Sequence, residues 1–204
     1  SFSVIHNDVA KMIKSDMNKI NFLKNQRSSD WFSTYRELHE IEDKINSIAV
    51  SSNIVTKEVI GQSYEGRDIL SIKISVDNSI EEKPAIFING CQHAREWITP
   101  MATTYLIETL SNEYDLDDDV NMFLNEVDVY IVAVVNPDGY VYTWEEDRWW
   151  RKNRQFNYYN NGDIHDCVGT DLNRNWDIDW NGGESTSEDP CSYIYSSCKE
   201  DQHN

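Results

Sequence analysis

The feature that most constrains the fold of this chain is a pair of apolar runs of strand length, each ending in a polar turn. The first run is Pro84–Asn89, and a helical spacing of apolar residues follows it from Ile98 to Leu110. The second run is Val127–Val135, which leads into an Asn-Pro-Asp-Gly turn. Open α/β sheets bind their ligands at the carboxyl ends of strands. We therefore expect the turn between the first strand and its helix to carry chemistry.

His93 and Glu96 lie in this turn, separated by two residues. An imidazole nitrogen and a carboxylate oxygen suit Zn²⁺, and a catalytic zinc takes such protein ligands plus one open position. The His-x-x-Glu spacing is not specific by itself. His39 and Glu42 share it on an apolar stripe over residues 38–48, which predicts an amphipathic helix with both side chains in solvent. A loop with a hydrogen-bonded histidine is the structural alternative for the first pair.

Three further segments carry the remaining polar motifs. Arg148–Arg154 is the densest basic cluster of an acidic chain, and Asp171–Trp176 places an amide beside a guanidinium. A guanidinium presents a planar fork of donors that matches a carboxylate bidentately. Ile60–Ile74 has two runs of alternating polarity about a glycine-containing turn, which predicts a β-hairpin. Taken one at a time, each segment also fits a structural loop.

In this order and at these spacings, the segments resemble the zinc metallocarboxypeptidases of the pancreatic A/B type, from about Trp31 to Cys191. The motifs that carry the resemblance are His-Ala-Arg-Glu-Trp-Ile (93–98), Asn-Pro-Asp-Gly-Tyr (136–140), Trp-Arg-Lys (150–152) and Asp-Leu-Asn-Arg-Asn-Trp (171–176). The resemblance implies an α/β fold with a mixed β-sheet flanked by helices, incomplete at the C-terminal side. It also implies zinc-dependent hydrolysis of the C-terminal peptide bond of peptides and proteins.

The resemblance assigns zinc binding to the strand-to-helix turn. It implies that His93 and Glu96 are two of three protein ligands of Zn²⁺, and that Asp171 fixes the tautomer and orientation of His93. The third ligand, a histidine, is expected well beyond Asn204, as is the general-base glutamate. We do not expect His203 to replace that ligand, because the ends of a chain are poorly held in place.

The other implied roles concern the substrate. Asn173 and Arg174 are expected to hold the free C-terminal carboxylate of a peptide. Arg151 is the expected catalytic cation, which polarises the scissile carbonyl and stabilises the oxyanion. Arg95 is expected to contact the residue upstream of the cleaved bond. A site built around a charged terminus leaves polar groups unpaired when the terminus is absent, so it rejects internal peptide bonds. The expected substrates are peptides and proteins with a free C-terminus.

The resemblance ends shortly after Ser192. The pocket residue that separates A-like from B-like side-chain specificity is expected later still, so this specificity is left open. Two alternatives to an active enzyme follow from the expected absence of the third ligand and the general base. One is a non-catalytic peptide-binding or decoy form that keeps the carboxylate clamp. The other is a fragment without function.

The N-terminal residues resemble the end of the family's inhibitory prosegment. An apolar stripe from Asp8 to about Phe22 predicts a helix, and a polar stretch follows it in which Lys24 or Arg27 is the expected activation cut. Residues 1–27 are thus expected to be the C-terminal part of a prosegment with its connecting helix, and residues 28–204 the N-terminal part of a catalytic domain. The alternative is an N-terminal helix with a surface linker.

A predicted capping box begins the next helix. Thr34 and Glu37 have the spacing of an N-cap and its reciprocal acid.

Composition restricts the partners of the chain. Its 204 residues suffice for a substantial core, and its formal net charge of −18 argues against nucleic acid, whose phosphates would be repelled. No apolar run approaches the length of a membrane-spanning helix. Together with the resemblance, this predicts a secreted protein that does not bind a membrane and is a monomer when full length.

The four cysteines allow three complete pairings. The resemblance implies a disulfide between Cys167 and Cys191. Cys91 is expected to be a buried free thiol beside the zinc site, and Cys198 to be unpaired.

Overall fold

The computed structural model describes residues 8–24, 30–77, 83–159, 162–177 and 186–196. It divides into two compact units, residues 1–36 and 37–204. The helix expected near the N-terminus is present as α1 (Val9–Lys24). Asp8 begins it by accepting a hydrogen bond from the backbone N–H of Lys11 through its carboxylate. The expected cleavage site at Arg27 lies outside the described residues.

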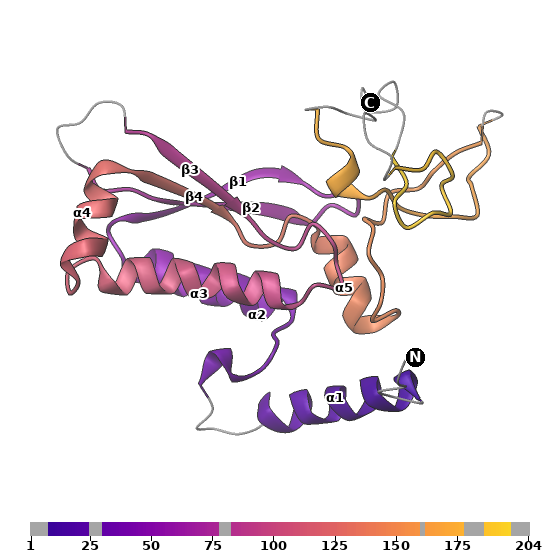
Figure 1. The fold of residues 1–204 in the computed structure, drawn as a ribbon, viewed down its shortest axis with the longest axis horizontal. Helices are drawn as coiled ribbons and strands as arrows, with labels where there is room; N and C mark the ends of the chain where they lie inside the picture. The colour runs from indigo at the N-terminus through magenta and orange to yellow at the C-terminus, as the bar shows by residue number, and fades with distance from the viewer. Residues whose placement is uncertain (1–7, 25–29, 78–82, 160–161, 178–185, 197–204) are drawn as a thin grey trace, which may run out of the picture. The chain divides into compact units, whose positions relative to one another are not determined.

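The second unit is built on a four-stranded mixed sheet (Figure 1). Its strands are β1 (Val55–Gln62), β2 (Asp68–Ile74), β3 (Ala85–Asn89) and β4 (Asp128–Val132), in the order β1-β2-β4-β3. The β1–β2 and β2–β4 pairs are antiparallel, whereas β3 and β4 run parallel. The predicted hairpin is therefore confirmed, and the parallel pair brings the carboxyl ends of the two predicted apolar strands to one edge of the sheet.

The helices of this unit are α2 (Leu38–Ser51), α3 (Ile98–Glu113), α4 (Asp118–Glu126) and α5 (Pro137–Glu145). In Figure 1, α2 and α3 run along one face of the sheet. The predicted mixed α/β architecture is thus confirmed. In the part of the chain that the structure describes, no helix is both long enough and apolar enough to cross a membrane.

The core lies between the sheet and these two helices. The side chains that fill it from β2 and β4 alternate along each strand, as the period of two requires. They are almost completely buried: Ile72, Ile74, Val129 and Ile131. From α2 the core takes Ile41, Ile45 and Ile48. Each buried side chain of this size stabilises the fold by about 1.5–3 kcal/mol, so this layer holds the edge of the sheet that carries the site.

The opposite face of the sheet is more open. Lys73, Tyr130 and Phe87 are neighbours in the strand register there, and the ammonium of Lys73 lies 5.5 Å from the centre of the Tyr130 ring. Phe87 is 56% exposed, on the edge strand β3.

Two local predictions were wrong. The capping box does not involve Thr34, because the backbone is extended at Thr34 and still extended at Glu37, the residue before α2. The backbone N–H of Glu37 instead donates to the carboxylate of Glu40 at 2.8 Å. The strand predicted over Val127–Val135 is also shorter in the structure, where β4 ends at Val132. Its continuation still bonds the site turn, since the Val135 N–H donates to the Gly90 carbonyl.

Candidate metal centre and carboxylate clamp

The turn after β3 is held against the end of β4 through its backbone. The Gly90 N–H donates to the Val132 carbonyl, and the Asn136 N–H donates to the carbonyl of Cys91. A Cβ at Gly90 would lie 2.8 Å from the Ala133 carbonyl oxygen, so only glycine fits this approach. Cys91 has a φ of 56°, which is unusual for a residue with a side chain. The turn that carries His93 is therefore held by the surrounding structure in a conformation it would not adopt by itself.

Cys91 is the buried free thiol that the sequence predicted. It is 1% exposed, and burial together with the negative charge of Glu96 raises the pKa of its thiol well above the ordinary range. A cysteine binds a metal as its thiolate. Cys91 is therefore a poor candidate ligand, although it lies close to His93 in the sequence.

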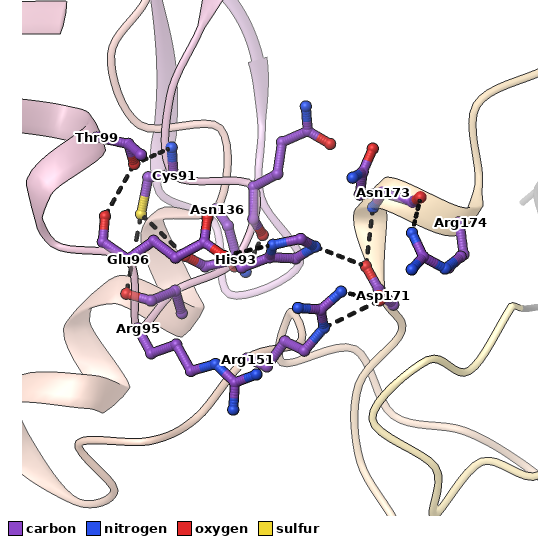
Figure 2. Close-up of polar contacts among 12 residues, drawn as sticks. Cys91, His93, Arg95, Glu96, Thr99, Asn136, Arg151, Asp171, Asn173 and Arg174 are labelled. Atoms are coloured by element: carbon purple, nitrogen blue, oxygen red, sulfur yellow. Dashed lines mark hydrogen bonds and ion pairs between the residues drawn. The ribbon is translucent and has the colours of Figure 1, made fainter. Parts of the chain in front are cut away.

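His93 lies between two carboxylates, one at each ring nitrogen (Figure 2). Its Nδ1 is 2.9 Å from Glu96 Oε1, and its Nε2 is 3.1 Å from Asp171 Oδ1. An ionised carboxylate only accepts hydrogen bonds, so a neutral imidazole donates to one of the two carboxylates, and with its proton on Nε2 it donates to Asp171. The lone pair of Nδ1 then faces Glu96 Oε1, so both atoms can contact one cation. This arrangement fits two ligands of one cation.

Asp171 is completely buried and holds several groups at once. Its Oδ2 accepts from Nε and Nη2 of Arg151 at 3.1 and 2.8 Å, and its Oδ1 also accepts from the backbone N–H of Asn173. Burial opposes ionisation, but the hydrogen bonds from His93 and Arg151 outweigh it and lower the pKa of Asp171. Asp171 therefore stays a carboxylate that can orient His93.

Arg151 and Arg95 are placed by the turn itself. The Ala94 N–H donates to the carbonyl of Arg151, while Arg148 donates to the carbonyl of Arg95 and stacks 3.7 Å from the centre of the Trp97 ring. The Arg95 guanidinium lies 5.9 Å from the ring centre of Tyr193.

Asn173 and Arg174 lie beyond Asp171 as seen from His93 (Figure 2). They belong to a short 3₁₀ turn in which the Arg174 N–H donates to the Asp171 carbonyl. The Arg174 guanidinium donates to the carbonyl of Asn173 at 2.8 Å, and the Ser196 hydroxyl donates to the carbonyl of Arg174. The turn keeps both clamp candidates within a few residues of the group that holds His93.

The structure thus brings His93, Glu96, Asp171 and Arg151 into one chain of direct contacts. Asn173 and Arg174 adjoin this chain, whereas Arg95 lies at its margin. Among the described residues, no third histidine, cysteine or carboxylate completes a three-ligand cluster with His93 and Glu96. His203 lies outside the described residues.

Gln92 and Trp176 connect the metal turn to the clamp segment, and sequence reasoning missed both. The Trp176 indole donates to Gln92 Oε1 at 3.1 Å, and Gln92 Nε2 donates to Asn89 Oδ1 at the end of β3. Asn136 supports the same turn by donating to the carbonyls of Gln92 and Lys152. Only indirect signs of these contacts are present in the sequence. Gln92 directly precedes His93, and Asn136 and Trp176 belong to the motifs that carry the family resemblance.

Asp138, in the first turn of α5, explains why the hairpin motif and the Asn-Pro-Asp-Gly motif occur together. It is 2% exposed and accepts from the Ser63 hydroxyl, the Glu65 N–H and the Arg67 guanidinium, all in the β1–β2 turn. The carboxylate therefore fixes the hairpin turn against α5.

The expected disulfide between Cys167 and Cys191 is present. Its loop of about 25 residues, which includes the 171–176 segment, stabilises the fold by roughly 3.5 kcal/mol in the chain-entropy model. Lys152 supports the loop by donating to the Pro190 carbonyl at 2.6 Å. Lys152 is 4% exposed, and burial lowers the pKa of its ammonium to about 8.

Comparison with known proteins decides the family. The zinc carboxypeptidase family matches residues 41–203, most of the chain and all of the site described above. The chain belongs to this family. Carboxypeptidase B of Astacus astacus is 40% identical to this zinc carboxypeptidase chain over 169 residues, covering 82% of the chain and 52% of the relative.

A solved structure gives the same result for the fold. The crystal structure of thrombin activatable fibrinolysis inhibitor matches with a TM-score of 0.80 and 34% identity, over 96% of this chain and 47% of that one. The inactive metallocarboxypeptidase ECM14 of Uncinocarpus reesii is also similar, at 37% identity over 83% of this chain and 29% of the relative. The carboxypeptidase chain spans about half the length, or less, of the curated relatives it matches.

Proposed function

We propose that this protein acts as a zinc metallocarboxypeptidase, which hydrolyses the last peptide bond of peptides and proteins with a free C-terminus. The observation that carries the proposal is the arrangement of His93 between Glu96 and Asp171. One ring nitrogen faces a second potential ligand, and the other is held by a buried carboxylate. An imidazole and a carboxylate are two ligands that zinc takes, and a carboxylate on the other ring nitrogen is the usual partner of a ligand histidine. The family to which the chain belongs supports the same assignment.

Zinc would be held by Nδ1 of His93 and the carboxylate of Glu96, and when bound it supplies a Lewis acid and an activated water. Asp171 keeps the His93 proton on Nε2, so that Nδ1 remains available. Glu96 is 45% exposed at its side chain, which leaves it accessible to a cation from solvent. The third ligand and the general base are proposed to come from residues other than those described.

Arg151 supplies the fixed positive charge at the site. Asp171 takes two of the five N–H donors of its guanidinium, so the remaining donors can bond a substrate oxygen. The buried carboxylate also fixes the plane of the guanidinium before substrate arrives. Preorganised donors of this kind are worth most where negative charge develops in the transition state.

Asn173 and Arg174 are proposed to bind the C-terminal carboxylate of the substrate. The Arg174 side chain would exchange its bond to the Asn173 carbonyl for a bidentate contact with that carboxylate. Arg95, whose guanidinium lies near Tyr193, is proposed to contact the residue upstream of the scissile bond.

The test compares a peptide that has a free C-terminal carboxylate with the same peptide amidated. Because the chain spans about half of its relatives, the assay uses residues 28–191, without the proposed prosegment, joined to the C-terminal half of carboxypeptidase B of Astacus astacus. We expect the chimera to release the last amino acid of the free peptide only, and to lose activity with a chelator. Equal cleavage of the amidated peptide would contradict the clamp.

Arg174→Ala and Arg174→Lys form a matched pair in this assay. Alanine should sharply lower kcat/KM for the free peptide, because the substrate carboxylate loses its charged partner in a partly buried site. Lysine keeps the charge without the planar fork, so its activity should be intermediate. Identical kinetics for the two variants would show that the fork does not contact the substrate.

A non-catalytic peptide-binding role is the second candidate. The described residues provide two zinc ligands, and some relatives are named inactive metallocarboxypeptidases. In that case the 204-residue chain should bind a peptide through its free carboxylate with no hydrolysis, and Arg174→Ala should abolish binding. Hydrolysis by the 204-residue chain, abolished by Glu96→Ala, would rule this role out.

The biological setting of the protein is also a proposal. Residues 1–27 would be the end of an inhibitory prosegment and residues 28–204 part of the catalytic domain, with activation by cleavage after Lys24 or Arg27. A secreted, monomeric zymogen is consistent with the disulfide, because such bonds persist in oxidising compartments. N-terminal sequencing after limited trypsin digestion tests the boundary, and a first cut outside residues 24–27 would contradict it.

A further inference from the structure

A second group of metal-binding side chains lies away from His93, at the disulfide. His165, Cys167 and Cys191 each offer one ligand atom, and these atoms lie within 4.8 Å of one another. We propose that, after reduction of the disulfide, these three residues form a site for a borderline or soft divalent cation such as Zn²⁺ or Cd²⁺. The cation would then close the loop that carries the carboxylate clamp in place of the covalent bond.

The first half of the cluster is held by a small hairpin. Tyr158 and Ile164 pair across it, and the His165 N–H donates to the Asn157 carbonyl at 2.7 Å. The Asn157 side chain donates in turn to the carbonyl of Cys167. The imidazole of His165 packs against the Tyr159 ring with 4.3 Å between ring centres. His165 and Cys167 are therefore positioned by contacts that do not involve the sulfur–sulfur bond.

Cys191 is positioned independently as well. Its backbone N–H donates to the carboxylate of Asp189 at 2.9 Å, and the Lys152 ammonium bonds the preceding carbonyl, that of Pro190. The Cα atoms of Cys167 and Cys191 lie 5.0 Å apart. These anchors would keep the two cysteines close after reduction, with the side chains free to turn so that both sulfurs reach one cation.

The donor atoms suit the proposed cations. Two thiolates and an imidazole are the ligands that borderline and soft metals prefer, and three protein ligands leave one position for water. His165 Nδ1 accepts a hydrogen bond from the backbone N–H of Cys167 at 2.9 Å, so its lone pair faces the main chain of that cysteine. A cation bound at Nδ1 would replace this hydrogen bond.

The chemical step is a balanced exchange. A dithiol or phosphine reductant gives two electrons to the disulfide, the S–S bond breaks, and two cysteine thiols form as the reductant is oxidised. Binding of M²⁺ then displaces one proton from each thiol, and two M–S bonds form.

The consequence concerns the segment inside the loop. Residues 171–176 lie between the two cysteines, so either form of closure restricts the clamp turn. The metal form would retain a closed loop under reducing conditions in which the disulfide is lost. This inference depends only on the cluster and not on the proposed peptidase activity.

The test is a Cd²⁺ titration of the reduced 204-residue chain, followed by the ultraviolet charge-transfer band of cadmium thiolates. Cys198, which lies outside the described residues, is replaced by Ser in every sample. Cys91 is 1% exposed and serves as an internal buried thiol. We expect a band that saturates at one Cd²⁺ per reduced chain, with no band for the oxidised chain. Cd²⁺ bound at His93 and Glu96 has no thiolate ligand and is silent at this band.

Two sets of variants decide the outcome. Cys167→Ser and Cys191→Ser should each remove most of the band. Loss of a residue that only supports a metal ligand already weakens metal binding roughly tenfold. His165→Gln removes a proposed ligand itself, so it should weaken Cd²⁺ binding by more than this. His39→Gln is the control, because His39 has the side chain 70% exposed on another element. Absence of the band, or equal affinity in the His165 and His39 variants, would overturn the proposal.

Discussion

Asp171→Asn is the perturbation that most sharply separates a role in positioning the metal ligand from a role in stability. The buried carboxylate accepts from His93 Nε2, from two nitrogens of Arg151 and from the Asn173 N–H. Asparagine has almost the same shape, but it carries no charge and replaces one acceptor oxygen by an NH₂ donor. That donor must face either the N–H of His93 or the guanidinium of Arg151.

The expected loss of stability follows from burial. Asp171 is 0% exposed and the side chain of Arg151 is 12% exposed, so the substitution leaves a largely buried cation without its partner. Breaking a buried pair in this way costs about 3–5 kcal/mol. Zinc affinity should fall about 10–100-fold, the usual effect of losing the group that orients a ligand histidine.

The assay measures unfolding in guanidinium chloride and zinc binding by competition with a chromophoric chelator. Asp138→Asn is the matched control, since Asp138 is also buried and bonded to an arginine, Arg67, but holds the hairpin turn. Both variants should lose stability, and only Asp171→Asn should lose zinc affinity. Equal loss of zinc affinity in the two variants, or none in Asp171→Asn, would refute the positioning role.

Three further predictions concern parts of the molecule outside the metal ligands. Burial lowers the pKa of Lys152 to about 8, so between about pH 8 and its ordinary pKa near 10.4 the unfolded chain binds a proton that the folded chain does not, and stability rises with pH. Urea unfolding of Lys152→Met should lack this rise, which is about 3 kcal/mol over this interval. The exposed Lys57→Met variant should keep it, and the same slope in both variants would contradict the assignment. Cys91→Gly should be at least as stable as Cys91→Ala, because the φ of 56° costs a non-glycine residue about 1 kcal/mol; a Gly variant less stable than Ala by thermal unfolding would show that the turn is not strained. Phe87 is 56% exposed on an edge strand, so the 204-residue chain should self-associate in sedimentation velocity and Phe87→Lys should reduce this, whereas a monomer before substitution would refute it.

The elements that the sequence predicted correctly are those in which a local pattern and burial agree. The apolar run before Asn89 became β3, and the stripe of Ile41, Ile45 and Ile48 became the buried face of α2. His93 and Glu96 were proposed as ligands because their spacing occurs directly after such a strand. In these segments the spacing of the apolar residues places them on the face that the tertiary structure buries.

Contacts between distant segments escaped prediction for a physical reason. The bond from Trp176 to Gln92 spans 84 residues and depends on how the disulfide loop lies over the strand end. The bonds of Asp138 to the β1–β2 turn span more than 70 residues. No local pattern records such pairings. The prediction of a capping box at Thr34 failed for a different reason. Thr34 and Glu37 both lie near the start of α2 and can both act as caps. The extended backbone at Glu37, directly before the helix, places the cap there.

The most direct test of the account is the ring nitrogen spectrum of His93 during zinc titration, by long-range proton–nitrogen NMR on histidine-labelled protein. The structure places Nε2 against the Asp171 carboxylate and turns Nδ1 toward Glu96. We expect the Nδ1 resonance to move on addition of zinc while Nε2 keeps its proton, with no response in Glu96→Ala at the same zinc concentration. A zinc-induced shift at Nε2, or a His93 ring that does not respond to zinc, would contradict the assignment of this turn as the metal centre.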